Sequence, residues 1–303
     1  MTSFWTLFAQ INAIIIPVFG VIMFGYAYGR FRPEAAPKQM AALNPLVMDF
    51  FTPMLIFGAM SQKSFDIYAN GSLVLAGLWV IFGSLVCGYL AAFVFRVQIR
   101  TLVPAIIYNN CGNMGLPLAL LAFGAAGFSQ AAILFVVCNF VYFSFGVWLL
   151  SGHRLSWKLF NTPIIWSMIL GLTMALLRVP VPEAIQQMLN FFTQAAITLM
   201  MFALGVRLLD IDWRLIKIGL LGGVLCPASS LLFAYIAQYL GMFHLTEQQM
   251  AQIYLFASLP PAVTCFMMAD YYQQEPAKVA AIVLIGNLLS LVFVPLGLAL
   301  ALG

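Results

Sequence analysis

Apolar segments long enough to cross a membrane follow one another along the whole chain. Of its 303 residues, 64% are hydrophobic and 7% are charged, whereas a soluble domain carries roughly 25% charged residues. A membrane-spanning helix needs about 20 apolar residues. The pattern therefore predicts an all-α polytopic membrane protein with ten transmembrane helices and short connections. The predicted spans are 8–29, 39–61, 71–95, 101–123, 128–150, 162–179, 183–207, 214–241, 249–270 and 277–302.

Lysine and arginine residues are distributed unevenly between the two sides of these spans. Eleven fall in loops on one side, and only Lys63 and Arg178 fall on the other. Because positive residues collect in cytoplasmic loops, both chain ends are predicted to face away from the cytoplasm. The net charge of +4 comes from dispersed residues without a basic run, so nucleic acid is not an expected partner.

No metal site, disulfide or cofactor is predicted. The five cysteines all lie inside apolar segments and form neither a CxxC pair nor a CxxC…HxxxH spacing. An intramembrane enzyme acting on a lipid or peptide substrate is the alternative to a transporter. Such an enzyme would need a pair of membrane aspartates or a buried histidine. Only Asp49 lies deep in a span, and His153 and His244 fall in loops.

The two halves of the chain carry similar short runs in the same order. Met48-Asp49-Phe50-Phe51-Thr52 in the second span corresponds to Leu189-Asn190-Phe191-Phe192-Thr193 in the seventh. Ala131-Ala132-Ile133-Leu134 in the fifth corresponds to Ala280-Ala281-Ile282-Val283 in the tenth. Five spans in each half give the halves, 1–150 and 162–303, inverted topology. Inverted five-helix repeats of this kind are typical of secondary transporters.

The fourth and ninth spans are interrupted at matching points. The fourth reads TLVPAIIYNNCGNMGLPLALLAFG, and the ninth contains Pro260-Pro261. Proline and glycine break a helix, and paired breaks in paired positions indicate a transport site near the membrane midplane. The alternative is a pair of proline kinks that serve packing only. The candidate substrate-binding residues are Asn110, Asn113, Gly115, Pro117, Pro260, Pro261 and Thr264.

The broken spans also indicate the charge of the ligand. Pro117 and Pro261 are expected in the first turn of a new half-helix, where free N–H groups and the positive dipole end favour an anion. The amides of Asn110 and Asn113 add donors without a fixed charge. No arginine is expected at this site. The sequence therefore predicts a carrier of a small organic anion, such as a carboxylate or an auxin-like weak acid.

The run Asn110–Leu118 resembles the fourth-span signature of the auxin efflux carrier family. This family includes plant pin-formed carriers and bacterial carriers of small carboxylates, within the bile acid/arsenite/riboflavin transporter-like superfamily. Leu259-Pro260-Pro261, Ala269-Asp270-Tyr271 and Pro276 resemble its second crossover and exit loop. The likeness covers essentially the whole chain. Plant carriers have a long central loop where this chain has only 151–161, so regulation through such a loop is not implied.

The resemblance implies ten spans in two inverted repeats, with spans 4 and 9 crossing at their prolines. It also implies an elevator-like motion, a homodimer formed through the scaffold, substrate contact by Asn110 and, for a bacterial-type member, location in the inner (plasma) membrane. The scaffold would comprise 8–29, 39–61, 162–179 and 183–207, and the transport part 71–150 and 214–302.

Four further polar residues lie within predicted spans. Asp49 lies near mid-bilayer, where an aspartate costs about 2.5 to 3.5 kcal/mol, so it is expected to face protein or water. We hypothesise that Asp49 carries a coupling proton; a structural role near Asn44 or a dimer contact is the alternative. Asn139, Asn190 and Asn287 are candidates for lining the cavity or for holding helices together. Proton coupling, sodium coupling and uniport all remain open, as does the direction of transport.

Overall fold

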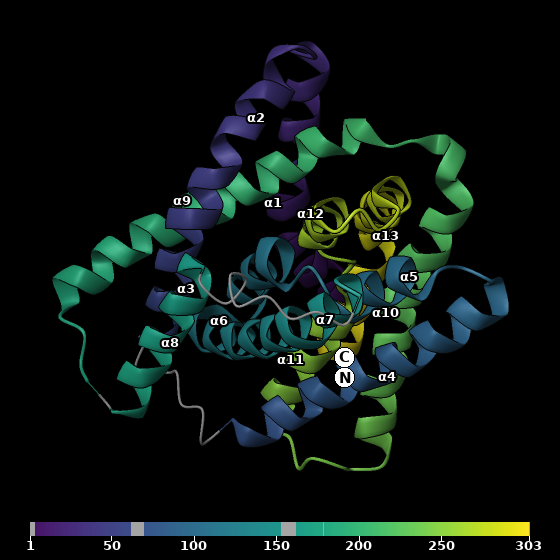
Figure 1. Ribbon diagram of the computed structural model, residues 1–303. Coiled ribbons are helices and arrows are strands. Elements are labelled where there is room, and N and C mark those ends of the chain that lie inside the picture. Colours follow the sequence, from purple (N-terminus) through teal and green to yellow (C-terminus); the bar gives the residue numbers. More distant parts are fainter. Residues whose placement is uncertain (1–3, 62–69, 153–161, 178, 303) are drawn as a thin grey trace.

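The computed structural model describes residues 4–61, 70–152, 162–177 and 179–302. Within these residues the chain is helical, and its only extended pairing is an isolated bridge between Asn109 and Pro261 (Figure 1). Of the loop cations in the orientation prediction, four lie outside the described residues: Lys63, Arg154, Lys158 and Arg178.

The helices follow one another with short connections. The first half contains α1 (Phe4–Phe31), α2 (Ala35–Leu46), the π-helical η1 (Val47–Phe51), α3 (Thr52–Met60), α4 (Gly71–Phe95), α5 (Ile99–Ile107), the π-helical η2 (Cys111–Gly115), α6 (Leu116–Val141), the π-helical η3 (Tyr142–Gly146) and α7 (Val147–Leu150). The second half contains α8 (Pro163–Leu176), α9 (Glu183–Arg207), the 3₁₀ turns η5 (Leu208–Asp210) and η6 (Trp213–Leu215), α10 (Ile216–Tyr239), α11 (Glu247–Ser258), α12 (Val263–Tyr271) and α13 (Pro276–Leu302).

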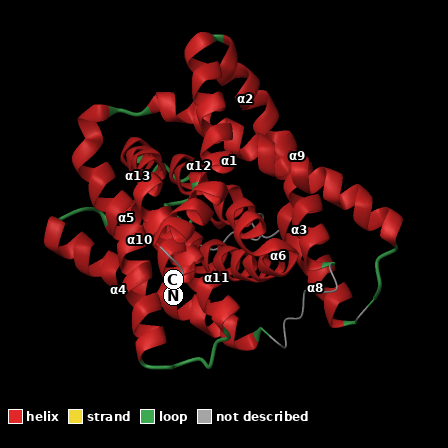
Figure 2. Cartoon of the chain, turned by 180° about the vertical axis from the view of Figure 1, so that it is seen from behind, coloured by secondary structure: helices red, strands yellow, loops and turns green. Residues whose placement is uncertain are grey.

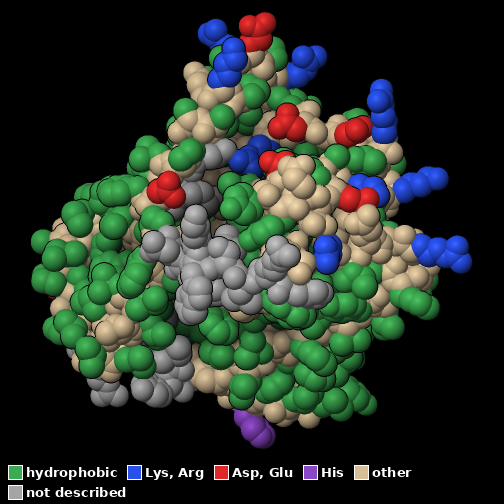
Figure 3. Space-filling view, viewed as in Figure 1, with side chains coloured by type: hydrophobic (Ala, Val, Ile, Leu, Met, Phe, Trp, Pro, Cys, Tyr) green, Lys and Arg blue, Asp and Glu red, His purple; other side chains and the backbone are tan. Residues whose placement is uncertain are grey.

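Six helical segments of the described chain are long and apolar enough to cross a membrane. They are Phe8–Phe31, Gly71–Phe95, Cys111–Leu150, Glu183–Asp210, Trp213–Tyr239 and Pro276–Leu302. The prediction of an all-helical membrane protein is confirmed at this level, and the count of ten spans stays a prediction. In Figure 3 hydrophobic side chains cover most of the visible surface, and the charged ones gather towards the top and right of the view.

The segment Cys111–Leu150 is divided inside α6. Gly124 has φ 67° and ψ −158°, a conformation that residues with a side chain rarely adopt. This point lies between the predicted spans 101–123 and 128–150. The glycine therefore allows the chain to leave one helical axis and start another there.

The helices form two packed groups (Figures 1 and 2). In one, which we call the α9 group, α1 packs on α9 and α3 packs on both α8 and α9, with α2 and η1 alongside. In the other, the α13 group, α10 packs on α13 and α4, α11 and α12 pack on α13, and α5 and α6 pack on α4. The groups meet where α3 and α1 contact α6, and where α1 contacts α13.

Glycines allow the closest helix pairs to form. A Cβ atom on Gly25 of α1 would lie 2.1 Å from the Phe202 carbonyl oxygen, and one on Gly205 of α9 would lie 1.9 Å from the Ile22 carbonyl oxygen. In the other group, a Cβ on Gly223 of α10 would lie 2.9 Å from the Cα of Gly286 in α13. Small residues at such contacts let helix backbones approach, which favours association where no hydrophobic driving force operates between helices.

The α1–α9 contact can be tested with two glycines of the same helix. We expect Gly25→Ala to lower the free energy of unfolding by about 1 to 3 kcal/mol, because the added methyl group forces the backbones apart. The matched control is Gly20→Ala, since nothing lies within 4 Å of a Cβ at Gly20. It should leave stability unchanged or raise it slightly, as alanine favours the helix. Thermal unfolding in detergent measures both, and equal midpoints for the two variants would contradict the close contact.

Candidate functional site

The two broken segments cross and pair with each other. Each consists of non-helical residues between two helices, Tyr108–Asn110 after α5 and Leu259–Ala262 after α11. The Asn110 backbone N–H donates to the Pro260 carbonyl at 2.7 Å, and the Ala262 N–H donates to the Tyr108 carbonyl at 2.8 Å. Backbone groups freed by a break have no water partner inside a membrane. Each broken segment therefore provides hydrogen-bond partners for backbone groups of the other.

The helix that follows each break, η2 running into α6 in the first half and α12 in the second, begins at a different point from the one expected. We call these the second half-helices. In the first half of the chain, the π-helical turn Cys111–Gly115 starts directly after the break and runs into α6, so Pro117 lies in the first turn of α6 but downstream of the restart. In the second half, the expectation that Pro261 occupies the first helical turn is wrong. Pro261 lies in the break, and α12 begins at Val263 after an extended Ala262. The physical reason is that a proline disfavours helical geometry in the residue before it, so Pro260-Pro261 keeps the chain extended.

Buried asparagine side chains fasten the crossing to the surrounding helices. Asn110 donates from Nδ2 to Oδ1 of Asn287 at 2.9 Å. The Asn287 Nδ2 in turn donates to the carbonyls of Pro261 at 3.2 Å and Val283 at 2.7 Å. Asn110 and Asn287 are 2% and 4% exposed. The side chain of Asn287 on α13 thus joins the two breaks from one side.

Asn109 fastens the crossing on another side, a role that the sequence analysis missed. Its Nδ2 donates to the Phe256 carbonyl of α11 at 2.8 Å, and its Oδ1 accepts from the Cys226 thiol of α10 at 3.5 Å. The only sequence signal was its position beside Asn110. Gly115 also packs against the second break, because a Cβ there would lie 2.8 Å from Cδ1 of Leu259.

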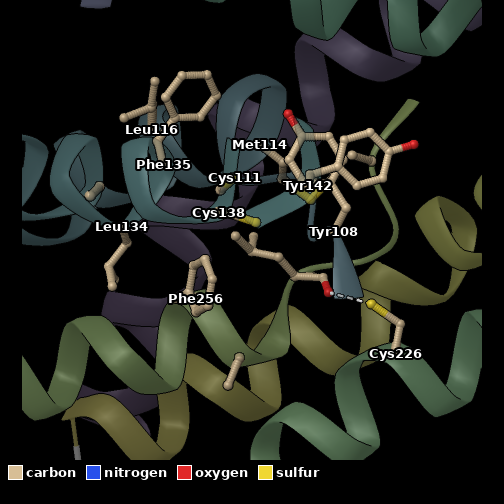
Figure 4. Close-up of a cluster of buried hydrophobic side chains, with 14 of the residues drawn as sticks. Tyr108, Cys111, Met114, Leu116, Leu134, Phe135, Cys138, Tyr142, Cys226 and Phe256 are labelled. Atoms are coloured by element: carbon tan, nitrogen blue, oxygen red, sulfur yellow. Dashed lines mark hydrogen bonds between the residues drawn. The ribbon is translucent and has the colours of Figure 1, made fainter. Parts of the chain in front are cut away.

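Asn139 binds the tyrosine at the start of the first break. The Tyr108 hydroxyl donates to Oδ1 of Asn139 at 2.6 Å, and Asn139 donates to the Phe135 carbonyl at 2.7 Å. The rings of Tyr108 and Tyr142 are stacked with their centroids 4.0 Å apart, and Figure 4 shows the two side chains next to each other. Thr264, half-buried in the first turn of α12, also interacts with the Tyr108 side chain. Asn139 therefore holds helices together at this point.

A small cavity lies beside the first turns of both second half-helices. Asn113 of η2 and Val263 of α12 line it, together with Arg207 from the end of α9. Its volume is about 20 Å³, which is room for about one water molecule. The other lining residues are Val47, Leu199, Met200, Ala203, Leu204 and Met267. The crossing thus brings Asn113 and the start of α12 together, whereas the Asn110 side chain is used in the buried network.

The expectation that no arginine lies at this site is wrong. Arg207 is distant in sequence from both breaks, but α9 ends beside them, so its half-buried side chain lines the same cavity as Asn113. Among the described residues, no group of three or more His, Cys, Asp or Glu is arranged to bind a metal ion.

Asp49 and Asn190 lie away from the crossing. Both side chains are exposed on the α9 group, Asp49 in η1 and Asn190 in α9. Their segments touch through an edge-to-face contact between Phe50 and Phe192, with centroids 5.4 Å apart. Neither residue lines the cavity at the crossing. The coupling role of Asp49 stays a prediction.

Known proteins resemble this chain over most of its length. A family model described as "Membrane transport protein" matches residues 11–154 and 147–298. A protein of Rhizobium meliloti (strain 1021) named "Putative malonate transporter" is 25% identical over 303 residues, which is 93% of each chain. A protein of Escherichia coli (strain K12) named "Uncharacterized transporter YfdV" is 22% identical over 280 residues, covering 85% of this chain and 87% of its own.

The asparagine network can be tested by a double-mutant cycle. We expect Asn287→Ala to lower the free energy of unfolding by about 1 to 3 kcal/mol, because it leaves the buried Asn110 amide and the Pro261 carbonyl without partners. Asn110→Ala should also destabilise, and the double variant should lose less than the sum, since the two side chains share one interaction. Denaturant unfolding in detergent measures the cycle. The exposed Asn190→Ala is the control, expected within about 0.5 kcal/mol of wild type. Additive losses would show that the two side chains do not interact.

Proposed function

The chain belongs to the family of membrane transport proteins that includes the auxin efflux carriers, and we propose that it is a secondary carrier of a small organic anion. The family consists of transporters, which argues against the intramembrane enzyme considered above. One observation carries the choice of an anion: the first turns of both second half-helices line one cavity, together with an arginine.

The electrostatics of that cavity support the sign of the ligand. Neither η2 nor α12 has a side-chain cap at its start. Helix N-termini of this kind present N–H groups and positive dipole ends, which favour negative charge. Asn113 can add an amide donor, and Arg207 adds a full positive charge. A carboxylate is the ligand that these groups fit.

The relative named for malonate supports the same ligand class, since malonate is a small molecule with two carboxylates. We therefore propose short-chain carboxylates as the substrates, bound at the crossing by Asn113, Thr264 and the backbone N–H groups at the start of α12. Asn110, Gly115, Pro117 and Pro260 would shape this site rather than all touch the ligand. No cofactor enters the proposal, and the driving force is a gradient of substrate, protons or sodium.

The proposed mechanism is alternating access of the elevator type. The α9 group would be the scaffold and the α13 group would carry the substrate. The cavity beside Asn113 lies between the two groups and is too small for a carboxylate, so binding requires the groups to move relative to each other. Paired breaks at matching points of the two halves support the inverted repeats 1–150 and 162–303.

Ten spans are proposed because the described helices account for more crossings than the six long segments. The segment Cys111–Leu150 has 40 residues, or about 60 Å of helix, against a bilayer core of about 30 Å. Its division at Gly124 fits two crossings. The shorter apolar segments Asp49–Met60 and Pro163–Leu176 and the broken pair α11/α12 would supply the other three crossings, and α5 would complete the first of the two crossings in Cys111–Leu150. From the charge asymmetry we propose that both chain ends face away from the cytoplasm, and from the family resemblance that the protein lies in a bacterial inner membrane.

A homodimer formed through the α9 group is proposed from its exposed polar residues. Asp49 and Asn190 lie on a surface that also exposes Phe50 and Phe191. An aspartate facing lipid near the membrane centre is costly. A second copy of the chain covering this surface would remove Asp49 from lipid, and membrane lipid would contact the remaining apolar surface.

Transport by the purified protein tests the proposed function. In proteoliposomes we expect currents or labelled counterflow with malonate and other small carboxylates, and none with neutral solutes of similar size. Asn113→Ala should raise the KM for malonate about tenfold or more, as loss of a hydrogen bond to a charged group costs about 1.5 to 3 kcal/mol. The exposed Asn190→Ala should leave the KM unchanged. Transport of a neutral or cationic solute and of no anion would contradict the assigned charge of the ligand.

The pH dependence of transport tests the coupling role of Asp49. If Asp49 carries a coupling proton, Asp49→Asn should abolish the stimulation of malonate transport by a pH gradient, because an amide cannot carry the proton. Asp212→Asn, in a loop, is the control and should behave as wild type. An unchanged pH dependence in Asp49→Asn would leave Asp49 with the structural or dimer role.

A further inference from the structure

A second, larger cavity also adjoins Arg207, and Asn113 does not line it. Its volume is about 450 Å³, within the range of small-ligand pockets, which starts near 300 Å³. Arg207 and Val263 line both this outer cavity and the small inner one. The outer cavity is bounded by both helix groups: α2 and α9 contribute Met40 and Val206, and α12 and α13 contribute Phe266 and Val283. Arg207 thus borders both spaces.

Arg207 is the only basic side chain among the described residues that line these two cavities. Asp210, exposed at the end of α9, is the only acidic one. No carboxylate of a described residue lies within 4 Å of the Arg207 guanidinium, since the described ion pairs consist of Lys278 with Glu275 alone. A half-buried guanidinium surrounded mainly by apolar side chains is stabilised by an anion that it can hydrogen-bond. The charge of Arg207 interacts with that of Asp210 at a separation beyond ion-pair distance. Arg207 is therefore positioned to bind an anionic ligand, with Asp210 as a nearby acidic residue.

Because Arg207 and Asn113 line one cavity, a single small ligand can contact both once that cavity widens. One carboxylate would lie against Asn113 and the start of α12, and a second negative group of the same ligand would face Arg207. The planar guanidinium forms two parallel hydrogen bonds to a carboxylate, which a lysine ammonium does not reproduce.

We propose that Arg207 is the residue that selects dicarboxylates over monocarboxylates, by binding the second carboxylate of the substrate from the α9 side of the site. This inference rests on the proposed anion transport. The inference goes beyond anion transport because it assigns a specificity-determining residue outside the broken spans. This residue lies on the helix group opposite to the one that holds Asn113.

The test compares malonate with monomethyl malonate, which has nearly the same size and one carboxylate fewer. In proteoliposomes of the full chain, the wild type should show a lower KM for malonate than for the monoester. Arg207→Gln should raise the malonate KM by about ten- to a hundredfold, with little effect on the monoester KM or on kcat. Arg207→Lys should restore part of the preference. Arg214→Gln is the matched control, because Arg214 is exposed and lines neither cavity.

Three kinetic results would overturn the proposal. An unchanged KM ratio in Arg207→Gln would show that Arg207 does not touch the second carboxylate. An equal rise for both substrates would show a general attraction of anions instead. If Asp210→Asn reproduced the effect of Arg207→Gln, Arg207 would serve to pair with Asp210. A wild type that moves neither compound would instead refute the proposed function itself.

Chemical labelling keeps the inference testable if Arg207→Gln does not fold. The single variant Arg207→Cys can be treated with a membrane-impermeant methanethiosulfonate, with the wild type as background, since four of its five cysteines are buried. Malonate should slow the labelling of the new thiol, and monomethyl malonate should slow it less. Equal labelling rates with and without malonate would overturn the proposal.

Discussion

The reciprocal pairing of the two broken segments is the constraint on which the rest of the structure depends. A break inside a membrane leaves backbone N–H and C=O groups that lipid cannot satisfy. Here the N–H of Asn110 and the carbonyl of Tyr108 find partners only in the other half of the chain, at Pro260 and Ala262. The two breaks must therefore lie side by side. This fixes where α5 meets α12 and where α11 meets η2.

The pairing also explains why the polar residues of the site fall into two classes. One class donates its side-chain amides to backbone carbonyls or to another asparagine, which makes the crossing a rigid unit: Asn109, Asn110 and Asn287. Asn113 lies one turn further along, beside the start of α12, and faces a cavity. The residues that make the crossing rigid and the proposed ligand-binding residue Asn113 are thus separated by a few positions of the same motif. A carrier needs both, because helix ends must stay aligned while the ligand enters and leaves.

Much of this arrangement could be predicted from local sequence. Hydropathy locates the helical segments, and the asparagine, glycine and proline residues of the fourth and ninth spans locate both breaks. The errors concern tertiary contacts. Pro261 lies in the break because two successive prolines keep the chain extended. The preference of proline for the first turn of a helix had favoured the wrong position. Hydropathy puts Arg207 at the end of the predicted span 183–207, but a single sequence does not tell which helix end folds back on the site. The exposure of Asp49 likewise depends on which face of η1 packs inward.

The position of Arg207 has a consequence for how a substrate would move. Arg207 belongs to the α9 group, whereas Asn113 and Val263 belong to the α13 group. A ligand that touches both sides stabilises the arrangement in which the groups face each other across the cavity. In the proposed elevator motion the ligand would travel with the α13 group, and it would have to release Arg207 while keeping its proposed contacts with Asn113 and the helix N-terminus. Amides and helix dipoles suit the travelling side, because they hold an anion without the fixed counter-charge that would oppose its release, and the single full charge stays on the other side.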